Sequence, residues 1–283
     1  MSMLHGHARA WAELPAVRPS YLRLLLVRHG ESIANRDRIL EGGCGDSGDK
    51  LTEKGKEDAR GLARALRDIV APDGDVGTAT ASSSSLPKRR CHMPVASSQM
   101  VRAVETAALL REMLAADDGD EDCMVIDGLE ELHYGRLAGN PTVDVLDEIR
   151  GISASWRSGD LTVKVGETGE CPLELQERAL AGIQRLVQEV CKAQRLGANA
   201  GSGPGYAVLV AHSWVNKILL CTWRKAPLES FQQTQQENCC VNVVDISTLN
   251  PADAEVHIVN WRPQVELPGV PEVAASLEAK SKV

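Results

Sequence analysis

The sequence lacks the features that would mark a membrane-spanning chain or a secreted disulfide scaffold. No apolar run reaches the roughly 20 residues that a membrane-spanning helix needs. Residues 1–20 contain no continuous apolar stretch of the kind found in signal peptides. The eight cysteines form no C-x-x-C pair and show no spacing typical of zinc ligands. We therefore expect reduced thiols, a cytoplasmic location and no membrane partner.

The chain also lacks an excess of positive charge. With 39 acidic residues against 31 lysines and arginines, its formal net charge is −8. This balance disfavours a nucleic-acid partner and leaves room only for a local basic pocket. The length and the 43% hydrophobic content are those of a globular protein with one sizeable core. The composition predicts one catalytic domain that binds a small anion through a few arginines.

Two hydrophobic periodicities alternate along the chain, which is typical of a layered α/β protein. Residues 22–27 and 207–211 are short, continuous apolar runs, and such runs predict strands that are buried on both faces. Other elements are predicted between and after them, with helices over 53–70, 101–110, 172–190 and from Trp214, and strands over 123–127, 239–246 and 255–261.

Low-complexity segments set the predicted limits of the domain. We expect an N-terminal extension over 1–20, a catalytic domain over 21–267 with a Ser-rich surface insertion at 76–92, and a C-terminal tail over 268–283. The glycine-rich stretch 201–206 precedes a strand and lacks the Gly-Lys-Ser/Thr end of a phosphate-binding loop. It is therefore predicted to be a linker.

Two of the predicted buried strands are followed by histidine, His29 and His212. In open α/β sheets, ligands bind outside the carboxyl ends of strands, so both side chains lie where a site is expected. An imidazole nitrogen can accept a phosphoryl group, and the charged phosphoryl oxygens need donors such as Arg28 and Arg102. A single histidine at a strand end is more often structural, so the prediction depends on this coincidence.

Five motifs, in order, resemble those of the histidine phosphatase (phosphoglycerate mutase-like) superfamily, branch 1. They are RHGES with Asn35, LTEKG at 51–55, SSQMVRAVETA at 97–107, LEELHYG at 129–135 and LVAHS at 209–213. The resemblance covers roughly residues 22–261. It implies a three-layer αβα sandwich with a mostly parallel central sheet, and an enzyme that needs no cofactor.

The resemblance also implies a role for each matching residue. His29 would be the nucleophile that becomes phosphorylated. Arg28, Arg102 and His212 would complete the phosphate pocket, with His212 beside the reacting group. Asn35 would reach the substrate or a phosphoryl oxygen.

Glu131 stands in the place of the family's acid, where it would protonate the leaving oxygen and then activate water. Its neighbour Glu130 is predicted to be a solvated bystander. Three further residues stay open at this point: Ser32 either caps a turn or serves the site, and His133 and Tyr134 belong either to the core or to the pocket wall.

The chain departs from the family after the second histidine, where glycine is usual and Ser213 and Trp214 stand instead. Ser213 is predicted to lie against the phosphate. Trp214 either covers the apolar face of a sugar at the pocket rim or packs into the core. The stretches 210–223 and 235–246 resemble a plant and cyanobacterial branch that includes 2-carboxy-D-arabinitol-1-phosphatases, which makes a plastid the alternative location.

Three functional classes follow from these residues. The favoured one is a phosphatase that hydrolyses a small phosphorylated metabolite, a sugar or carboxylic-acid phosphate, through a phosphohistidine. A mutase is the first alternative, but the segment after LHYG is short for the lid insertion of the family's mutases. A catalytically silent anion-binding module is the second. No metal is expected, because the histidines show no ligand spacing, and the sequence gives no indication of the oligomeric state.

Overall fold

Six strands form one sheet in the order β3-β2-β4-β1-β5-β6. Five of them point the same way and only β5 is reversed: β3, β2, β4 and β1 form parallel pairs, and β5 is antiparallel to both of its neighbours, β1 and β6. The expected α/β fold with a mostly parallel sheet is thereby confirmed. The strand bounds are β1 (Tyr21–Arg28), β2 (Val95–Ser97), β3 (Met124–Val125), β4 (Gly205–Ala211), β5 (Val241–Ser247) and β6 (Ala254–Trp261).

These elements come from a computed structural model that describes residues 11–41, 49–70, 93–114, 123–194 and 205–263. The predicted Ser-rich insertion, most of the predicted linker and the predicted tail lie outside the described residues. Within the described parts of the chain, no helix combines the length and the apolar character needed to cross a membrane.

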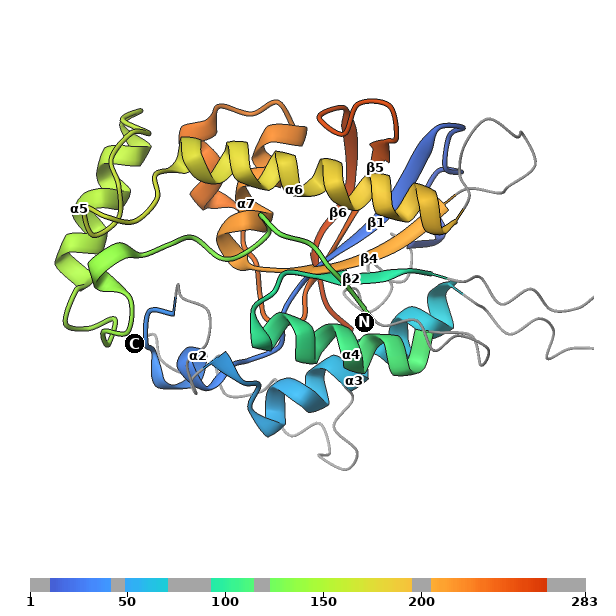
Figure 1. Ribbon diagram of the computed structural model, residues 1–283, viewed down its shortest axis with the longest axis horizontal. Helices are drawn as coiled ribbons and strands as arrows, with labels where there is room; N and C mark the ends of the chain where they lie inside the picture. The colour runs from blue at the N-terminus through green and yellow to red at the C-terminus, as the bar shows by residue number, and fades with distance from the viewer. Residues whose placement is uncertain (1–10, 42–48, 71–92, 115–122, 195–204, 264–283) are drawn as a thin grey trace, which may run out of the picture.

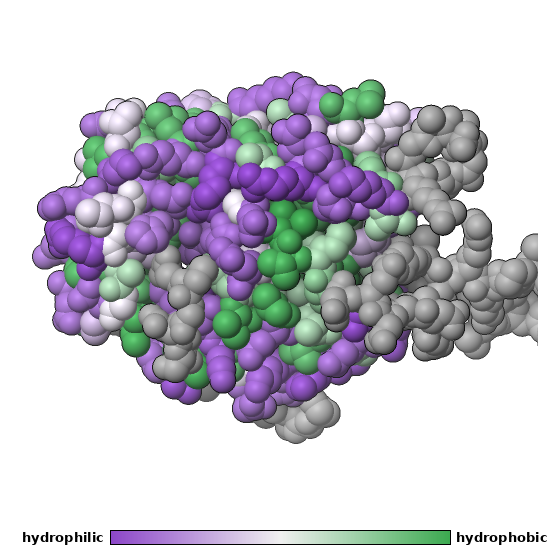
Figure 2. Space-filling model, viewed as in Figure 1, coloured by the Kyte–Doolittle hydropathy of each residue, from purple (hydrophilic) through white to green (hydrophobic). Residues whose placement is uncertain are grey.

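Helices cover both faces of the sheet, which makes three layers (Figure 1). α3 (Glu53–Val70) and α4 (Val101–Leu114) lie on one face, and α6 (Pro172–Ala193) and α7 (Ser213–Trp223) lie on the other. Figure 2 shows hydrophilic side chains over the outer face of α6 and a hydrophobic strip between α6 and α4. The remaining helical segments are α2 (Ile33–Asp37), η2 (Gly135–Leu137), α5 (Leu146–Arg157) and η3 (Leu228–Gln233).

Strand β1 shows how the sequence builds two separate cores. Leu22, Leu24 and Leu26 pack with the helices α6 and α7, whereas Leu25 and Val27 pack with α3 and α4. This division follows from the period of two in a strand, because successive side chains point to opposite faces. The continuous apolar run therefore reflects burial on both faces, as predicted.

Two elements differ from the sequence-based expectations. α5 was not predicted, although it buries Trp156 and packs Ile149 and Ile152 against the core. The strand predicted over 123–127 is shorter, since β3 contains only Met124 and Val125. Part of the predicted N-terminal extension packs on the domain, with the ring of Trp11 at 5.2 Å from that of Trp261.

The start of α3 approaches the loop after β1 very closely. A Cβ placed on Gly30 would lie 2.7 Å from the carbonyl oxygen of Gly55. A Cβ placed on Gly55 would overlap the backbone of Glu31. The two glycines thus let the LTEKG turn pack against the loop that begins with the first histidine.

The variant Gly55→Ala should lower the free energy of unfolding by about 1–3 kcal/mol, because the new methyl group has no space. Gly61→Ala is the matched control in the same helix, where the nearest atom to a new Cβ is 3.8 Å away on the flexible Arg64 side chain. It should raise the stability by about 0.5–1 kcal/mol, since alanine restricts the unfolded chain. Denaturant unfolding of both variants tests this, and equal effects would contradict the packing argument.

Candidate active site

The candidate site lies where the parallel strands β1 and β4 end. Their register places Arg28 opposite Ala211, so His29 and His212 follow at the same edge of the sheet. The backbone N–H of His29 donates to the carbonyl of Ala211 at 3.1 Å, and the two imidazole centroids are 5.1 Å apart. The structure therefore brings together the two histidines that the sequence singled out.

A cavity of about 340 Å³ opens beside these histidines. Every predicted site residue except His212 lines it, and the fully buried ring of His212 neighbours that of His29. Its wall contains Arg28, His29, Ala34, Asn35, Arg38, Ile39, Leu40, Glu41, Arg102, Glu131, Tyr134, Thr142, Ser213, Trp214 and Lys217.

The protonation of His29 follows from its hydrogen bonds. Nδ1 lies 2.7 Å from the carbonyl oxygen of Gly30, which can only accept, so Nδ1 carries the proton. Nε2 therefore holds a lone pair, and Arg102 Nε donates to it at 3.2 Å. Burial lowers the pKa of His29 well below its usual value, and the charges of Arg102 and Arg28 lower it further. The ring is therefore neutral.

His212 is fully buried and has one fixed partner. Its Nε2 lies 2.6 Å from the hydroxyl of Ser98, and its Nδ1 has no hydrogen-bond partner among the described residues. When Ser98 donates to Nε2, Nδ1 carries the ring proton and can donate it to an oxygen of a bound anion. Burial is the main reason why the pKa of His212 also lies well below its usual value.

Acidic groups from a distant loop hold Arg102 in place. Asp49 forms an ion pair with Arg102 Nη1 and also accepts from the backbone N–H of Val101 at 2.7 Å. A carboxylate oxygen of Glu41 lies 3.4 Å from the same guanidinium nitrogen. Asp49 was not predicted, because an acidic residue in a polar loop carries no periodic or motif signal.

Arg28 is fixed on one side only. Its Nη1 donates to the carbonyl oxygen of Gln236 at 2.6 Å, whereas its buried Nε has no partner among the described residues. Burial lowers the pKa of Arg28, and the carboxylate of Glu131 opposes this effect. Gln236 is held in turn by buried amides, at 3.0 Å from Asn216 and 2.8 Å from Asn242. This network was not predicted from the sequence.

Asn35 and Ser32 begin the short helix α2. Ser32 caps the helix and is fully buried, which resolves its role in favour of the cap. The side-chain oxygen of Asn35 accepts from Asn238 Nδ2 at 3.0 Å, and the same nitrogen donates to the carbonyl of His29 at 3.1 Å. Asn35 therefore lines the cavity while its oxygen is already engaged.

Glu131 lies at the N-terminus of α7. Its Oε1 accepts from the backbone N–H groups of Leu132 and Trp214, both at 3.0 Å. Its Oε2 has no hydrogen-bond partner among the described residues. Glu130 turns away from the cavity: it accepts from the N–H of Gly128 and pairs with Arg178 at 3.3 Å, so it is an ion-paired residue of the loop and not the predicted solvated one.

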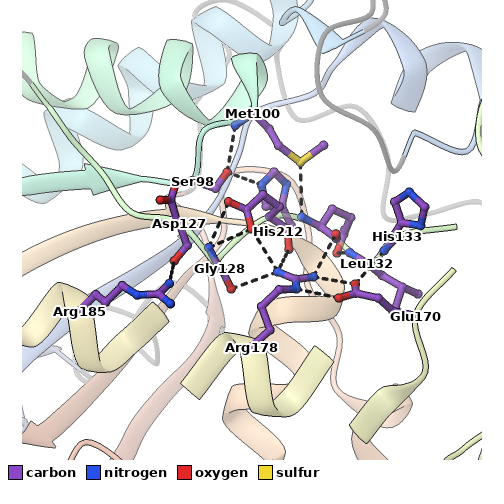
Figure 3. Close-up of polar contacts among 12 residues, drawn as sticks. Ser98, Met100, Asp127, Gly128, Leu132, His133, Glu170, Arg178, Arg185 and His212 are labelled. Carbon is purple, nitrogen blue, oxygen red and sulfur yellow. Dashed lines mark hydrogen bonds and ion pairs between the residues drawn. The ribbon is translucent and has the colours of Figure 1, made fainter. Parts of the chain in front are cut away.

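Arg178 on α6 fixes the loop that carries Glu131 (Figure 3). It forms two hydrogen bonds of 2.7 Å with the carboxylate of Glu170. It also donates to the carbonyl oxygens of Gly128 and Glu130, both at 3.0 Å. This bidentate pair was missed, since a single arginine on the polar side of an amphipathic helix looks solvated in the sequence.

The two residues that replace the usual glycine both line the cavity. Trp214 also packs against Trp156 and Phe231, at 5.9 and 5.6 Å between centroids. Its Nε1 donates to the hydroxyl of Tyr134 at 2.7 Å. Trp214 therefore belongs to the wall and to the core at once, Tyr134 lines the wall, and the adjacent His133 is exposed.

Within the described residues, no group of three or more His, Cys, Asp or Glu side chains is placed to hold a metal ion.

Comparison with known proteins gives one family and several similar structures. The family described as "Histidine phosphatase superfamily (branch 1)" matches residues 24–256. "Probable phosphoglycerate mutase GpmB" of Erwinia tasmaniensis is 25% identical over 225 residues, which are 79% of this chain and 85% of that protein.

Two solved structures share the fold. A mycobacterial glucosyl-3-phosphoglycerate phosphatase has a TM-score of 0.60 at 21% identity, covering 85% of this chain and 99% of that one. The alpha-ribazole phosphatase of Shigella flexneri has a TM-score of 0.56 at 23% identity, covering 85% and 96%.

The buried histidines should make the protein less stable as the pH falls. Above pH 6.5 they are neutral in both the folded and the unfolded state. Below it, the unfolded chain takes up protons that His29 and His212 refuse in the fold, because their folded pKa values are lowered. Each histidine should lower the free energy of unfolding by about 1.4 kcal/mol per pH unit until the pH reaches its folded pKa.

Unfolding experiments from pH 7.5 to 5 measure this slope. His29→Asn and His212→Asn should each make the dependence shallower. A slope that neither buried variant alters would contradict the assignment of neutral histidines.

Proposed function

The chain belongs to branch 1 of the histidine phosphatase superfamily, and we propose that it hydrolyses a small phosphomonoester through a phosphohistidine, without a metal ion. Membership of this family indicates a phosphoric monoester hydrolase or a phosphoglycerate mutase-like enzyme. The observation that carries the proposal is His29, whose Nδ1 proton is engaged by Gly30 while its Nε2 lone pair lies in the cavity beside Arg102.

In the first step, His29 Nε2 attacks phosphorus. The N–P bond forms, the ester P–O bond breaks, and a protonated Glu131 gives its proton to the leaving oxygen. The developing charge on the phosphoryl oxygens is met by Arg28, Arg102 and His212. The buried Arg28 Nε and His212 Nδ1, which have no partner among the described residues, are suited to this task.

In the second step, water takes the place of the leaving group. Glu131, now a carboxylate, removes a proton from the water as its oxygen attacks phosphorus. The N–P bond breaks, inorganic phosphate forms, and His29 recovers its lone pair. The two N–H donors on Oε1 keep the carboxylate aimed with Oε2 available for both proton transfers.

The proposed substrate is a sugar or carboxylic-acid phosphate. The names of the similar proteins, glucosyl-3-phosphoglycerate phosphatase, alpha-ribazole phosphatase and phosphoglycerate mutase, fit a small phosphorylated metabolite. The resemblance to 2-carboxy-D-arabinitol-1-phosphatases stays a prediction, as do the cytoplasmic location and its plastid alternative.

A phosphate-release assay over sugar phosphates, phosphoglycerates and carboxyarabinitol phosphate, with EDTA present, tests the proposal. A phosphatase releases phosphate, a mutase moves the phosphoryl group from one position of the substrate to another, and a silent module does neither. Wild-type protein should release phosphate and yield an acid-labile, base-stable phosphoprotein. His29→Ala should yield neither, and His133→Ala should behave as wild type. Unchanged turnover in His29→Ala would exclude this nucleophile.

The leaving group should reveal the role of Glu131. An alkyl alcohol needs a proton as it leaves, so Glu131→Gln should lose on the order of 10²–10⁴-fold in rate on an alkyl phosphate. On an aryl phosphate, whose leaving group is a weak base, the rate of the same variant should fall clearly less. Glu130→Gln is the matched control, and its effect should be small and equal on both substrates. Equal losses for Glu131→Gln would mean that it does not act as the acid.

A further inference from the structure

We propose that Lys217 forms a second anion-binding subsite in the cavity and selects phosphomonoesters whose leaving group carries a carboxylate. This inference rests on the proposed function and names the substrate class of the same site. It is carried by the position of Lys217, by the partners it lacks among the described residues, and by the ring beneath it.

Helix geometry brings Lys217 to the cavity. Lys217 is four residues after Ser213 on α7, and side chains at this spacing lie on one face of a helix. Ser213 directly follows His212, and both Ser213 and Lys217 line the cavity. The ammonium group is therefore built into the same wall as the phosphoryl site.

Lys217 differs in its partners from Arg28 and Arg102, the two inner arginines of the cavity; the fourth cation of the lining, Arg38, is exposed. Arg102 is paired with Asp49, and Arg28 donates to the carbonyl of Gln236. Lys217 forms no hydrogen bond or ion pair with any described residue, and its only specific contact is with the ring of Trp214, 4.9 Å from Nζ to centroid. Its three N–H donors are thus available to a ligand.

The charges around Lys217 favour an anionic ligand. Burial lowers its pKa, the charge of Arg28 acts in the same direction, and Glu131 opposes them. Glu131 is the stronger of these two charges, but it forms no hydrogen bond or ion pair with Lys217 in the described part of the chain. When a carboxylate binds, a half-buried ammonium without a close counter-ion gains more electrostatic free energy than an exposed ammonium does.

The ring beneath Lys217 is held by several contacts. Trp214 is held by its hydrogen bond to Tyr134 and by the rings of Trp156 and Phe231. A lysine that lies over such a ring is restrained by the cation–π contact. Part of the entropy cost of ordering the side chain is therefore already met before a ligand binds.

The same contacts indicate which part of the substrate Lys217 meets. The phosphoryl group must lie at His29, and the leaving oxygen must lie at Glu131. The backbone of Trp214 binds Glu131, and its ring carries Lys217. Lys217 therefore lies on the leaving-group side of the site, where an anionic substituent of that group can reach it.

The test compares D-3-phosphoglycerate with sn-glycerol 1-phosphate, which has the same configuration at C2 and carries a hydroxymethyl group in place of the carboxylate. Dissociation constants are measured by calorimetry in the His29→Ala background, where no turnover is expected, and kcat/KM is measured in the wild-type background. Lys217→Met should weaken binding of phosphoglycerate by roughly 10- to 100-fold and change glycerol phosphate by less than about threefold. Lys217→Arg should keep most of the preference.

Arg224→Met removes an exposed cation from the end of the same helix and should change neither ligand. Three outcomes would each overturn the subsite: Lys217→Met weakens the binding of both ligands equally, it weakens the binding of neither, or the protein with Lys217 intact binds the two ligands equally well. If the wild type hydrolyses nothing but still binds phosphoglycerate through Lys217, the proposed function fails and the subsite stands. Melting temperatures of all variants identify any that fail to fold.

Discussion

The parallel pairing of β1 with β4 is the constraint on which the candidate site depends. Seven residue pairs align the two strands, so that both end at the same level and both are followed by histidine. A shift of one residue would turn each apolar side chain of β1 to the opposite face of the sheet, so that neither core would keep its present packing. Burial of leucine and valine on both sides of β1 therefore sets the register, and the register in turn sets the distance between the two imidazoles.

The site concentrates positive charge in a buried place, which the fold offsets in two ways. Both histidines stay neutral, because burial and the neighbouring guanidinium groups disfavour their protonation. Each arginine has a fixed acceptor, a carboxylate for Arg102 and a carbonyl oxygen for Arg28. What remains is a set of donors already oriented toward an anion, so that little reorganisation is needed when a phosphoryl group enters.

Residues that lie at strand ends or within ordered motifs could be predicted from the sequence, and residues that act across long separations could not. His29 and His212 follow from apolar runs, and α3 follows from its helical stripe. Asp49 and Arg178 carry no local pattern, because their importance arises only when a loop or a helix meets a distant segment. α5 escaped prediction for another reason: it begins without a start signal, because Val145 at its N-cap has no side chain that can cap the helix.

The departure from the family's usual glycine changes which side chains line the cavity. Glycine after the second histidine would leave the start of α7 without side chains, whereas here Ser213 and Trp214 form part of the wall. The exchange is tolerated because the indole turns toward Trp156 and Phe231, while the Trp214 backbone N–H still reaches Glu131. One residue thus joins the proposed acid, through its backbone, to the proposed carboxylate subsite at Lys217, through its ring. On this argument, substrate choice depends on the first two turns of α7 as much as on the loops around the cavity.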